Sequence, residues 1–431
     1  MKRRFVYLVS RLSNSALSVL VGFVTTYSLI RVVGADDLGL LLIVAAAAAY
    51  LNVADLGVST ALYAYARRHH VRRTSIRTVP LAMLVLGAYL AVALLSSLLA
   101  YGLLVIFVGE GHAVAPAYLA AFFLYGALNL PWLCIRSLYS AIDLHLTFDL
   151  IDFCRRLSQL VVIALPLLHL SLELTFGLLC LIWLLAFAVA LMQLLRALGV
   201  RRLMSRRSAT FAGRQFSTNL QRSSGFAALF SVCEFFTYNM LYVLVPTLYA
   251  MGLPLIVFDT YSKLFRGGIV ANQLPSSVFL PEQTKAFHTG NLPSLNRMVW
   301  LSVLASVAVA AIVSVALVAV APWFFDSLLD GRYQPTPAFL AAIVIVLLGN
   351  AVQNGFGTVI VNLGFLSGAA WLAAATTGAI GVVSVAAWLF QWPIDIYLLA
   401  YSIIYAVCAA CWGLAWGVLR RGTVHRQGVA A

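Results

Sequence analysis

Long apolar stretches alternate with short polar segments along all 431 residues of the chain. A helix needs about 20 apolar residues to cross a bilayer, and twelve stretches are long enough. The pattern therefore predicts an all-α polytopic membrane protein, whose fifth and eighth spans are the least apolar. The predicted spans are 12–33, 41–64, 80–108, 115–136, 150–171 and 174–195, then 224–249, 254–280, 299–325, 338–363, 368–390 and 395–419.

A basic segment at 196–222 separates the first six spans from the last six. It contains seven arginines and no acidic residue. A basic tail that binds nucleic acid is disfavoured, because the segment is internal and its neighbours are too apolar to leave lipid. We therefore expect a cytoplasmic linker between two six-helix bundles, 1–195 and 223–431, and no nucleic-acid partner.

Composition and charge agree with this class of protein. Hydrophobic residues make up 63% of the chain and charged residues 10%, which excludes an ordinary soluble domain. Lysine and arginine gather in alternate loops, so that the other loops contain only Arg31 and Arg332. By the positive-inside rule, this distribution predicts that both termini lie in the cytoplasm.

The two halves show a weak internal repeat. A shift of 218 positions places Gly34 on Gly252 and Arg67 on Lys285, and superimposes the first two spans of each half. We therefore expect a duplicated six-helix unit, with the copies related by an axis along the membrane normal.

Several kinds of chemistry lack their motifs. The sequence has no phosphate-binding loop of the Walker type, no GxSxG and no HExxH. Cys408 and Cys411 form a CxxC inside a predicted span, where packing is a better explanation than zinc or redox chemistry. We therefore expect a protein that is not an enzyme and that holds no metal or cofactor.

The eighth span contains a polar stripe. Its members fall at i, i+4, i+7, i+14 and i+18, which is one helix face. They are Asp259, Lys263, Arg266, Gln273 and Ser277. The cations can line a water-filled cavity and attract an anion. Alternatively, Asp259 pairs with Lys263 within the helix, and Arg266 bridges to Glu234 and holds the bundle together.

Two carboxylates are candidates for ion coupling. Asp55 and Glu234 lie in the second and seventh spans, where an ionisable group is costly and commonly functional. Each can couple transport to a proton or sodium gradient, or can accept hydrogen bonds at a helix interface. Asn354 in the tenth span is a candidate for substrate binding, with helix packing as the alternative.

Short motifs resemble the polysaccharide transporter family, the O-antigen and exopolysaccharide flippases of the multidrug, oligosaccharidyl-lipid and polysaccharide exporter superfamily. The motifs are Gly34-Ala-Asp-Asp-Leu-Gly39, Asp55-Leu56-Gly57 with Ala61-Leu62, then Tyr261, Arg266, Pro281 and the segment 285–291. The resemblance implies two six-helix bundles in a V around a central cavity, working by alternating access in the bacterial inner membrane.

The resemblance also implies a cargo and partners. The cargo would be a polyprenyl-pyrophosphate-linked oligosaccharide, whose pyrophosphate Lys263 and Arg266 would bind. Asp55 or Glu234 would couple its transport to a proton or sodium gradient. Partners would be membrane lipids and the polysaccharide polymerase machinery. The in-span charges nearly balance, however, unlike the cationic cavity expected of the family. The alternatives are a cation-coupled multidrug exporter on the same fold and a membrane-embedded glycan polymerase or ligase.

Overall fold

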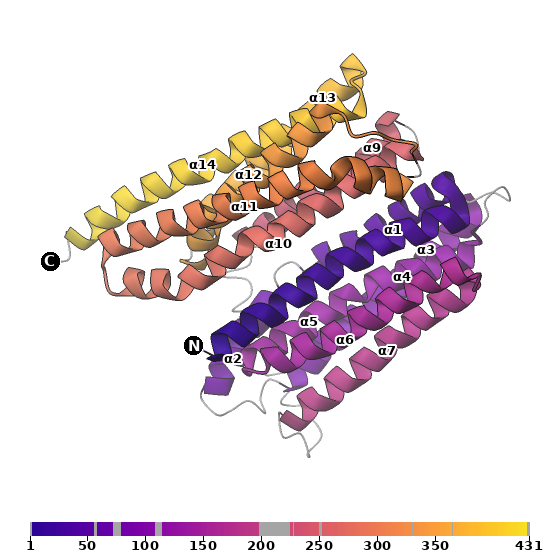
Figure 1. The fold of residues 1–431 in the computed structure, drawn as a ribbon. Coiled ribbons are helices and arrows are strands. Elements are labelled where there is room, and N and C mark those ends of the chain that lie inside the picture. The colour runs from indigo at the N-terminus through magenta and orange to yellow at the C-terminus, as the bar shows by residue number, and fades with distance from the viewer. Residues whose placement is uncertain are drawn as a thin grey trace. The chain divides into compact units, whose positions relative to one another are not determined.

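A computed structural model describes residues 2–55, 58–71, 79–107, 114–197, 225–226, 228–249, 252–329, 331–363 and 365–428. These residues form helices joined by short turns, and no strand occurs among them (Figure 1). The chain divides into two compact units. Unit 1 contains residues up to 231 together with 251–256, and unit 2 contains 232–250 and 257–431.

The described part of unit 1 is built from seven α-helices and two short 3₁₀ helices. They are α1 (Lys2–Tyr50), η1 (Leu51–Asp55), α2 (Val58–Val71), α3 (Val79–Phe107), α4 (Pro116–Ala127), α5 (Asn129–Ala141), α6 (His145–Ala164), η3 (Leu165–Leu168) and α7 (Leu172–Ala197). Most of the basic segment at 196–222, from residue 198 on, lies outside the described residues.

Gly34 divides α1 into the first two predicted spans. Its φ of 84° and ψ of 178° interrupt the helix and are accessible to glycine alone. Gly252, which the 218-residue shift pairs with Gly34, also has a positive φ, of 100°, just before a long helix. The two positions therefore require glycine for the same backbone reason.

Unit 1 is organised around α1 and α6. Helix α1 packs on α4 and α6, while α6 also packs on α7, and α3 lies against α4 and α5. The interior contains stacked and edge-on aromatic rings, with Trp183 only 1% exposed. The rings of Trp132 and Trp183 lie 5.4 Å apart at an interplanar angle of 85°, a favourable edge-on arrangement.

The described part of unit 2 contains six long helical segments. The first is a helix over 228–239 that continues into α9 (Leu241–Tyr249) to form one span. The others are α10 (Leu253–His288), α11 (Leu292–Leu329), α12 (Pro337–Asn362), α13 (Leu366–Phe390) and α14 (Ile394–Gly428).

Helix α12 is the centre of unit 2 and packs on both α11 and α14. Glycines permit this approach. A Cβ on Gly349 would lie 2.9 Å from the Ala406 Cα of α14, and one on Gly355 would lie 2.5 Å from Val303 of α11. Close backbone contact through small residues is a common way to pack membrane helices. The glycines of the tenth span therefore serve packing.

Hydrogen bonds join the turn before α12 to the start of α14 in unit 2. Tyr333 and Thr336, in the turn before α12, each donate a hydrogen bond of 2.7 Å to Asp395 at the start of α14. Burial and the Asp395 carboxylate raise the pKa of the Tyr333 phenol, so it stays a donor throughout the physiological pH range. Thr336 also caps α12 by accepting from the Phe339 amide.

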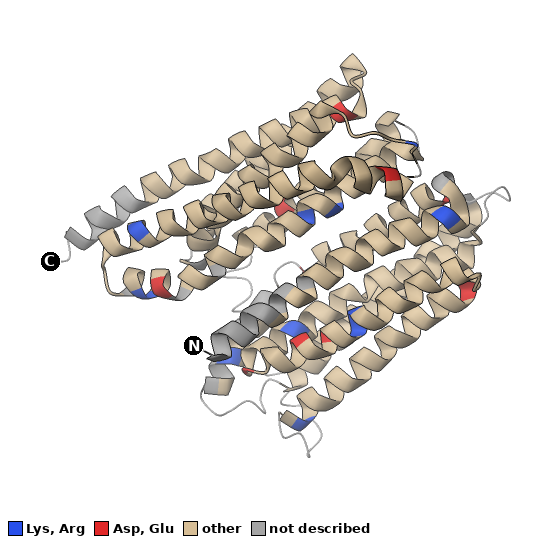
Figure 2. Ribbon diagram, in the orientation of Figure 1, with Lys and Arg blue, Asp and Glu red and all other residues tan. Residues whose placement is uncertain are grey.

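The prediction of an all-helical polytopic membrane protein is confirmed. Ten described helices are long and apolar enough to span a membrane. The fifth and eighth predicted spans do not reach that apolarity, but both are helical, as α6 and the first part of α10. Figure 2 shows how few Lys, Arg, Asp and Glu positions interrupt the described helices.

Candidate functional site

The Asp55 carboxylate is engaged in local hydrogen bonds. Its Oδ1 accepts from the Ser59 amide at 3.0 Å, from the Ser59 hydroxyl, and from the Tyr89 hydroxyl of α3 at 2.6 Å. Ser59 is in the first turn of α2, so the hydrogen bond from its backbone amide to Asp55 caps the N-terminus of that helix. Asp55 therefore fits the hydrogen-bond alternative considered from the sequence.

Asp259 and Lys263 form the expected pair within α10. The Tyr242 hydroxyl donates to Asp259 Oδ1 at 2.9 Å. Asp259 is 2% exposed, and the Lys263 side chain is 16% exposed. The first part of the polar stripe is thus neutralised inside unit 2, which leaves little positive charge on Lys263 for an anionic ligand.

Arg266 bonds to Asn239 and does not bridge to Glu234, so this part of the packing alternative is not found. Its Nη2 donates to the Asn239 side-chain oxygen at 2.7 Å, and its Cζ lies 5.8 Å from the centre of the Tyr242 ring. Arg266 is exposed, and so is Gln273 seven residues on along α10. The polar stripe of α10 therefore begins with the Asp259–Lys263 ion pair inside unit 2 and continues with the accessible side chains of Arg266 and Gln273. The Ser277 side chain lies outside the described part of the chain.

Glu234 is half-buried and has neither a hydrogen bond nor an ion pair with any residue that the structure describes. Among the other described carboxylates of the predicted spans, Asp152 and Asp259 are ion-paired, and Asp55 and Asp395 are hydrogen-bonded. Glu234 thus retains its capacity to bind a proton or a cation.

A hydrogen-bonded chain of buried and half-buried polar side chains crosses unit 2, beginning at Tyr238, four residues after Glu234. Tyr238 and Tyr405 bring their hydroxyls to 3.1 Å, and the Asn350 amide donates to Tyr405 at 3.0 Å. Asn354 donates to Asn350 Oδ1 at 2.7 Å, so this candidate for substrate binding belongs to the chain. Asn272 of α10 donates to the same oxygen at 3.3 Å. The chain therefore links α10, α12, α14 and the 228–239 helix.

The two tyrosines were not among the residues singled out from the sequence. Tyrosine counts as apolar in a span, so its hydroxyl is hidden in hydropathy analysis. The sequence nevertheless contains a signal, because Tyr397, Tyr401 and Tyr405 recur at intervals of four and therefore share one helix face. In the structure all three are almost fully buried. A buried phenol usually has a hydrogen-bond partner, which makes such a row a marker of a polar interior.

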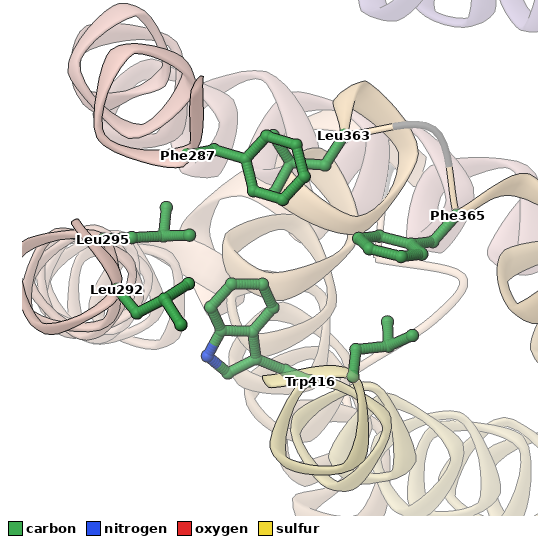
Figure 3. A pocket seen from close by; sticks show the side chains of 7 residues that line it. Phe287, Leu292, Leu295, Leu363, Phe365 and Trp416 are labelled. Carbon is green, nitrogen blue, oxygen red and sulfur yellow. The ribbon is translucent and has the colours of Figure 1, made fainter. Parts of the chain in front are cut away.

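A small apolar pocket lies elsewhere in unit 2, lined by α10, α11, α14, the cap residue that follows α12 and the one that precedes α13 (Figure 3). Phe287, Phe365 and Trp416 surround it, and Trp416 donates to the Asn296 side chain at 3.3 Å. The pocket contains none of the predicted site residues. In the part of the chain that the structure describes, no group of His, Cys, Asp or Glu could hold a metal ion.

No protein-family model and no curated protein matches this chain. Solved structures of MATE transporters do match, over nearly its whole length. A point mutant of the MATE transporter VcmN from Vibrio cholerae gives a TM-score of 0.67 at 13% identity, covering 98% of this chain and 97% of that one. An inward-facing multidrug resistance MATE family transporter of the MOP superfamily gives 0.66 at 14% identity, covering 97% and 96%.

A third structure, of MATE in complex with MaL6, gives a TM-score of 0.64 at 14% identity, covering 98% of this chain and 96% of that one. The chain therefore has the fold of the MATE transporters of the MOP superfamily, and it is a multi-pass membrane protein. This agrees with the fold expected from the sequence. The neighbours named here are MATE transporters, so they give no support to the polysaccharide branch.

Proposed function

We propose that this chain is a cation-coupled exporter of small molecules that works by alternating access. The observation that carries the proposal is the likeness of the whole chain, over 97–98% of its length, to MATE transporters that include a multidrug resistance transporter. Export of a drug-like molecule, the alternative considered from the sequence, is therefore preferred to glycan transport. The charge distribution supports insertion in a bacterial inner membrane with both termini cytoplasmic.

Glu234 is the residue that we propose for coupling, to either a proton or a sodium gradient. Its carboxylate has no fixed hydrogen-bond or ion-pair partner among the described residues, whereas Asp55 is occupied by Ser59 and Tyr89. A carboxylate that changes its charge state inside a span alters the electrostatic energy of its surroundings, as coupling requires.

Transport by reconstituted protein tests this proposal. Proteoliposomes containing the chain should move a lipophilic fluorescent dye when a proton or sodium gradient is imposed, and Glu234→Gln should abolish that movement. Glu282→Gln is the matched control, because Glu282 is exposed near the end of α10 and the chemical change is the same. Gradient-driven transport by Glu234→Gln at the unmodified rate would refute the assignment of Glu234. Failure of every dye under both gradients would refute the exporter proposal.

A second candidate function has one observation in its favour. Arg266 is exposed in a predicted span and is held by the neutral side chain of Asn239, so its positive charge is available to an anionic cargo. A lipid-linked oligosaccharide on a pyrophosphate would fit, and the polysaccharide polymerase machinery would then be a partner.

The sidedness of lipid-linked oligosaccharide in cells decides between the two cargoes. Its accumulation on the cytoplasmic face of cells that lack this protein, with loss of surface polysaccharide, would favour the flippase. Arg266→Gln should then impair export of the glycan. Unchanged sidedness in those cells, together with increased dye accumulation, would favour the small-molecule exporter.

A further inference from the structure

A group of charged and aromatic side chains lies inside unit 1, apart from the residues proposed for coupling. Asp152 and Arg155 of α6 are 7% and 5% exposed. Asp152 Oδ1 accepts from Arg155 Nε at 3.0 Å and Nη2 at 2.5 Å, and from Trp132 Nε1 at 3.0 Å. The Arg155 guanidinium also lies over the Trp183 ring, with Cζ 3.9 Å from its centre. Arg155 is therefore held firmly by an ion pair and a cation–π contact.

Arg156 adds a second cation to the same carboxylate. Its Nε donates to Asp152 Oδ2 at 2.8 Å, and its side chain is 26% exposed. Arg155 and Arg156 both form ion pairs with Asp152, whose single negative charge balances only one of them. The ion pairs of this group therefore leave one positive charge in surplus. The two Nη groups of Arg156 have no acceptor among the described residues. The group is thus cationic, and its accessible member presents unused donors.

Two further donors nearby lack an acceptor. Gln159 Nε2 and Trp183 Nε1 are buried without a hydrogen-bond partner in the structure. Gln159 is one turn beyond Arg155 on the same helix face, and Trp183 supplies the ring on which Arg155 stacks. Together with these groups, the surplus charge of Arg156 and its unused donors favour binding of an anion.

The depth of Arg156 in the predicted span bears on whether the anion can be a lipid headgroup. The fifth predicted span begins at residue 150, so Arg156 is six residues along it, which is roughly 9 Å at the helical rise. That depth is inside the roughly 30 Å hydrocarbon core, below the headgroups of lipids that rest in the leaflet. Charge inside the hydrocarbon core is costly, so a partner for the surplus charge, from water or from a cargo, is favoured.

We propose that Arg156, backed by Arg155, is an anion-binding site of unit 1 that takes a phosphate group from solution or from a passing amphiphile. The free edge of the Arg156 guanidinium offers two N–H groups in the planar arrangement that phosphate oxygens accept. Asp152 fixes the position of this edge. The surplus charge supplies the attraction. The site belongs to unit 1, whereas Glu234 belongs to unit 2, and the proposal does not depend on the molecule exported.

Pyrophosphate binding to the full-length protein in neutral detergent tests the site. At constant ionic strength, inorganic pyrophosphate should raise the thermal unfolding midpoint, and Arg156→Gln should weaken its apparent affinity by about tenfold or more. Arg297→Gln is the matched control, because it removes the same charge from an exposed position on α11 of unit 2. We expect that control to bind like the unmodified protein.

Arg156→Lys controls for a folding defect in Arg156→Gln, because the lysine keeps a positive charge beside Asp152. It should fold and bind pyrophosphate with intermediate affinity. Equal affinities of the unmodified protein and of Arg156→Gln would overturn the proposal, and so would an absence of pyrophosphate binding. Nanodiscs of phosphatidylglycerol and of phosphatidylcholine distinguish the sources. Stabilisation by phosphatidylglycerol that requires Arg156, without a pyrophosphate effect, would also overturn it, because the anion would then be a leaflet headgroup.

Discussion

Asp55 and Glu234 have the same functional group and similar positions in predicted spans, but their surroundings differ. Three donors from two residues meet Asp55 Oδ1, whereas Glu234 has neither a hydrogen bond nor an ion pair among the described residues. A carboxylate that accepts several hydrogen bonds is held in place by its donors, which makes Asp55 a structural element. The Glu234 carboxylate is not held in this way by the described residues.

Substitutions at Asp55 separate its structural role from a coupling role. Asp55→Ala should lower the stability of the protein by about 1–3 kcal/mol, because it removes the cap of α2 and leaves the Tyr89 hydroxyl without its acceptor. Asp55→Asn keeps an acceptor oxygen and should retain most of the stability and the transport rate. Thermal unfolding in detergent and dye transport measure the two. Loss of transport by a stable Asp55→Asn would contradict the structural role.

Tyr405 can be tested in the same way. Tyr405→Phe removes the hydroxyl that contacts both Tyr238 and the Asn350 amide and should cost about 1 kcal/mol of stability. Tyr249→Phe is the control, because the structure gives the hydroxyl of Tyr249 no hydrogen-bond partner. A double-mutant cycle with Tyr238→Phe should show coupling between the two phenols. Additive effects in that cycle would mean that the hydroxyls do not interact.

At the scale of elements, α12 shows how glycine permits close packing. Gly349 faces the backbone of α14, where a Cβ would lie 2.9 Å from the Ala406 Cα, whereas a Cβ on Gly378 of α13 would meet nothing within 4 Å. Glycine inside a helix costs roughly 0.5–1 kcal/mol relative to alanine, so its presence at Gly349 needs such a compensating reason.

The same substitution at these two glycines should have opposite effects. Gly378→Ala should raise stability by roughly 0.5–1 kcal/mol, because alanine is the better helix former and space is free. Gly349→Ala should lower it by about 1–3 kcal/mol, because α14 must shift to admit the methyl group. Unfolding midpoints of the two variants, measured side by side, test this. Equal shifts of the same sign would show that α12 and α14 are not in close contact at Gly349.

At the scale of the whole molecule, the charge distribution predicts which helix ends share a side of the membrane. Lys285 near the end of α10 and Arg297 near the start of α11 belong to the predicted cytoplasmic side, and Arg332 belongs to the opposite side. Two long helices, α10 and α11, connect through a short turn beside Lys285. This topology remains a prediction.

Labelling of single cysteines tests this topology in intact cells. With the six native cysteines replaced, a membrane-impermeant maleimide should label Arg332→Cys, and should label Lys285→Cys only after permeabilisation. Both side chains are exposed, which makes the two positions comparable. Labelling of Lys285→Cys in sealed cells would reverse the proposed orientation.

Much of the fold was predictable from the sequence, because lipid leaves a spanning chain few choices. Backbone groups in a bilayer must be satisfied within helices or closed barrels, so span lengths of about 20 apolar residues were sufficient to predict the helices. The charged helix α6 and the charged helix α10 were also recognised as spans that are less apolar. Gly34 and Gly252, paired by the weak repeat, proved to share a positive φ.

The site was only partly predictable, because partners come from different helices. The sequence identified Glu234, Lys263 and Arg266 as unusual, and the Asp259–Lys263 pair followed from its spacing of four. It did not reveal that Arg266 bonds Asn239, 27 positions away, or that Tyr405 lies beside Tyr238, 167 positions away. Spacing along one helix is set by the helix itself, whereas contacts between helices depend on how their side chains pack.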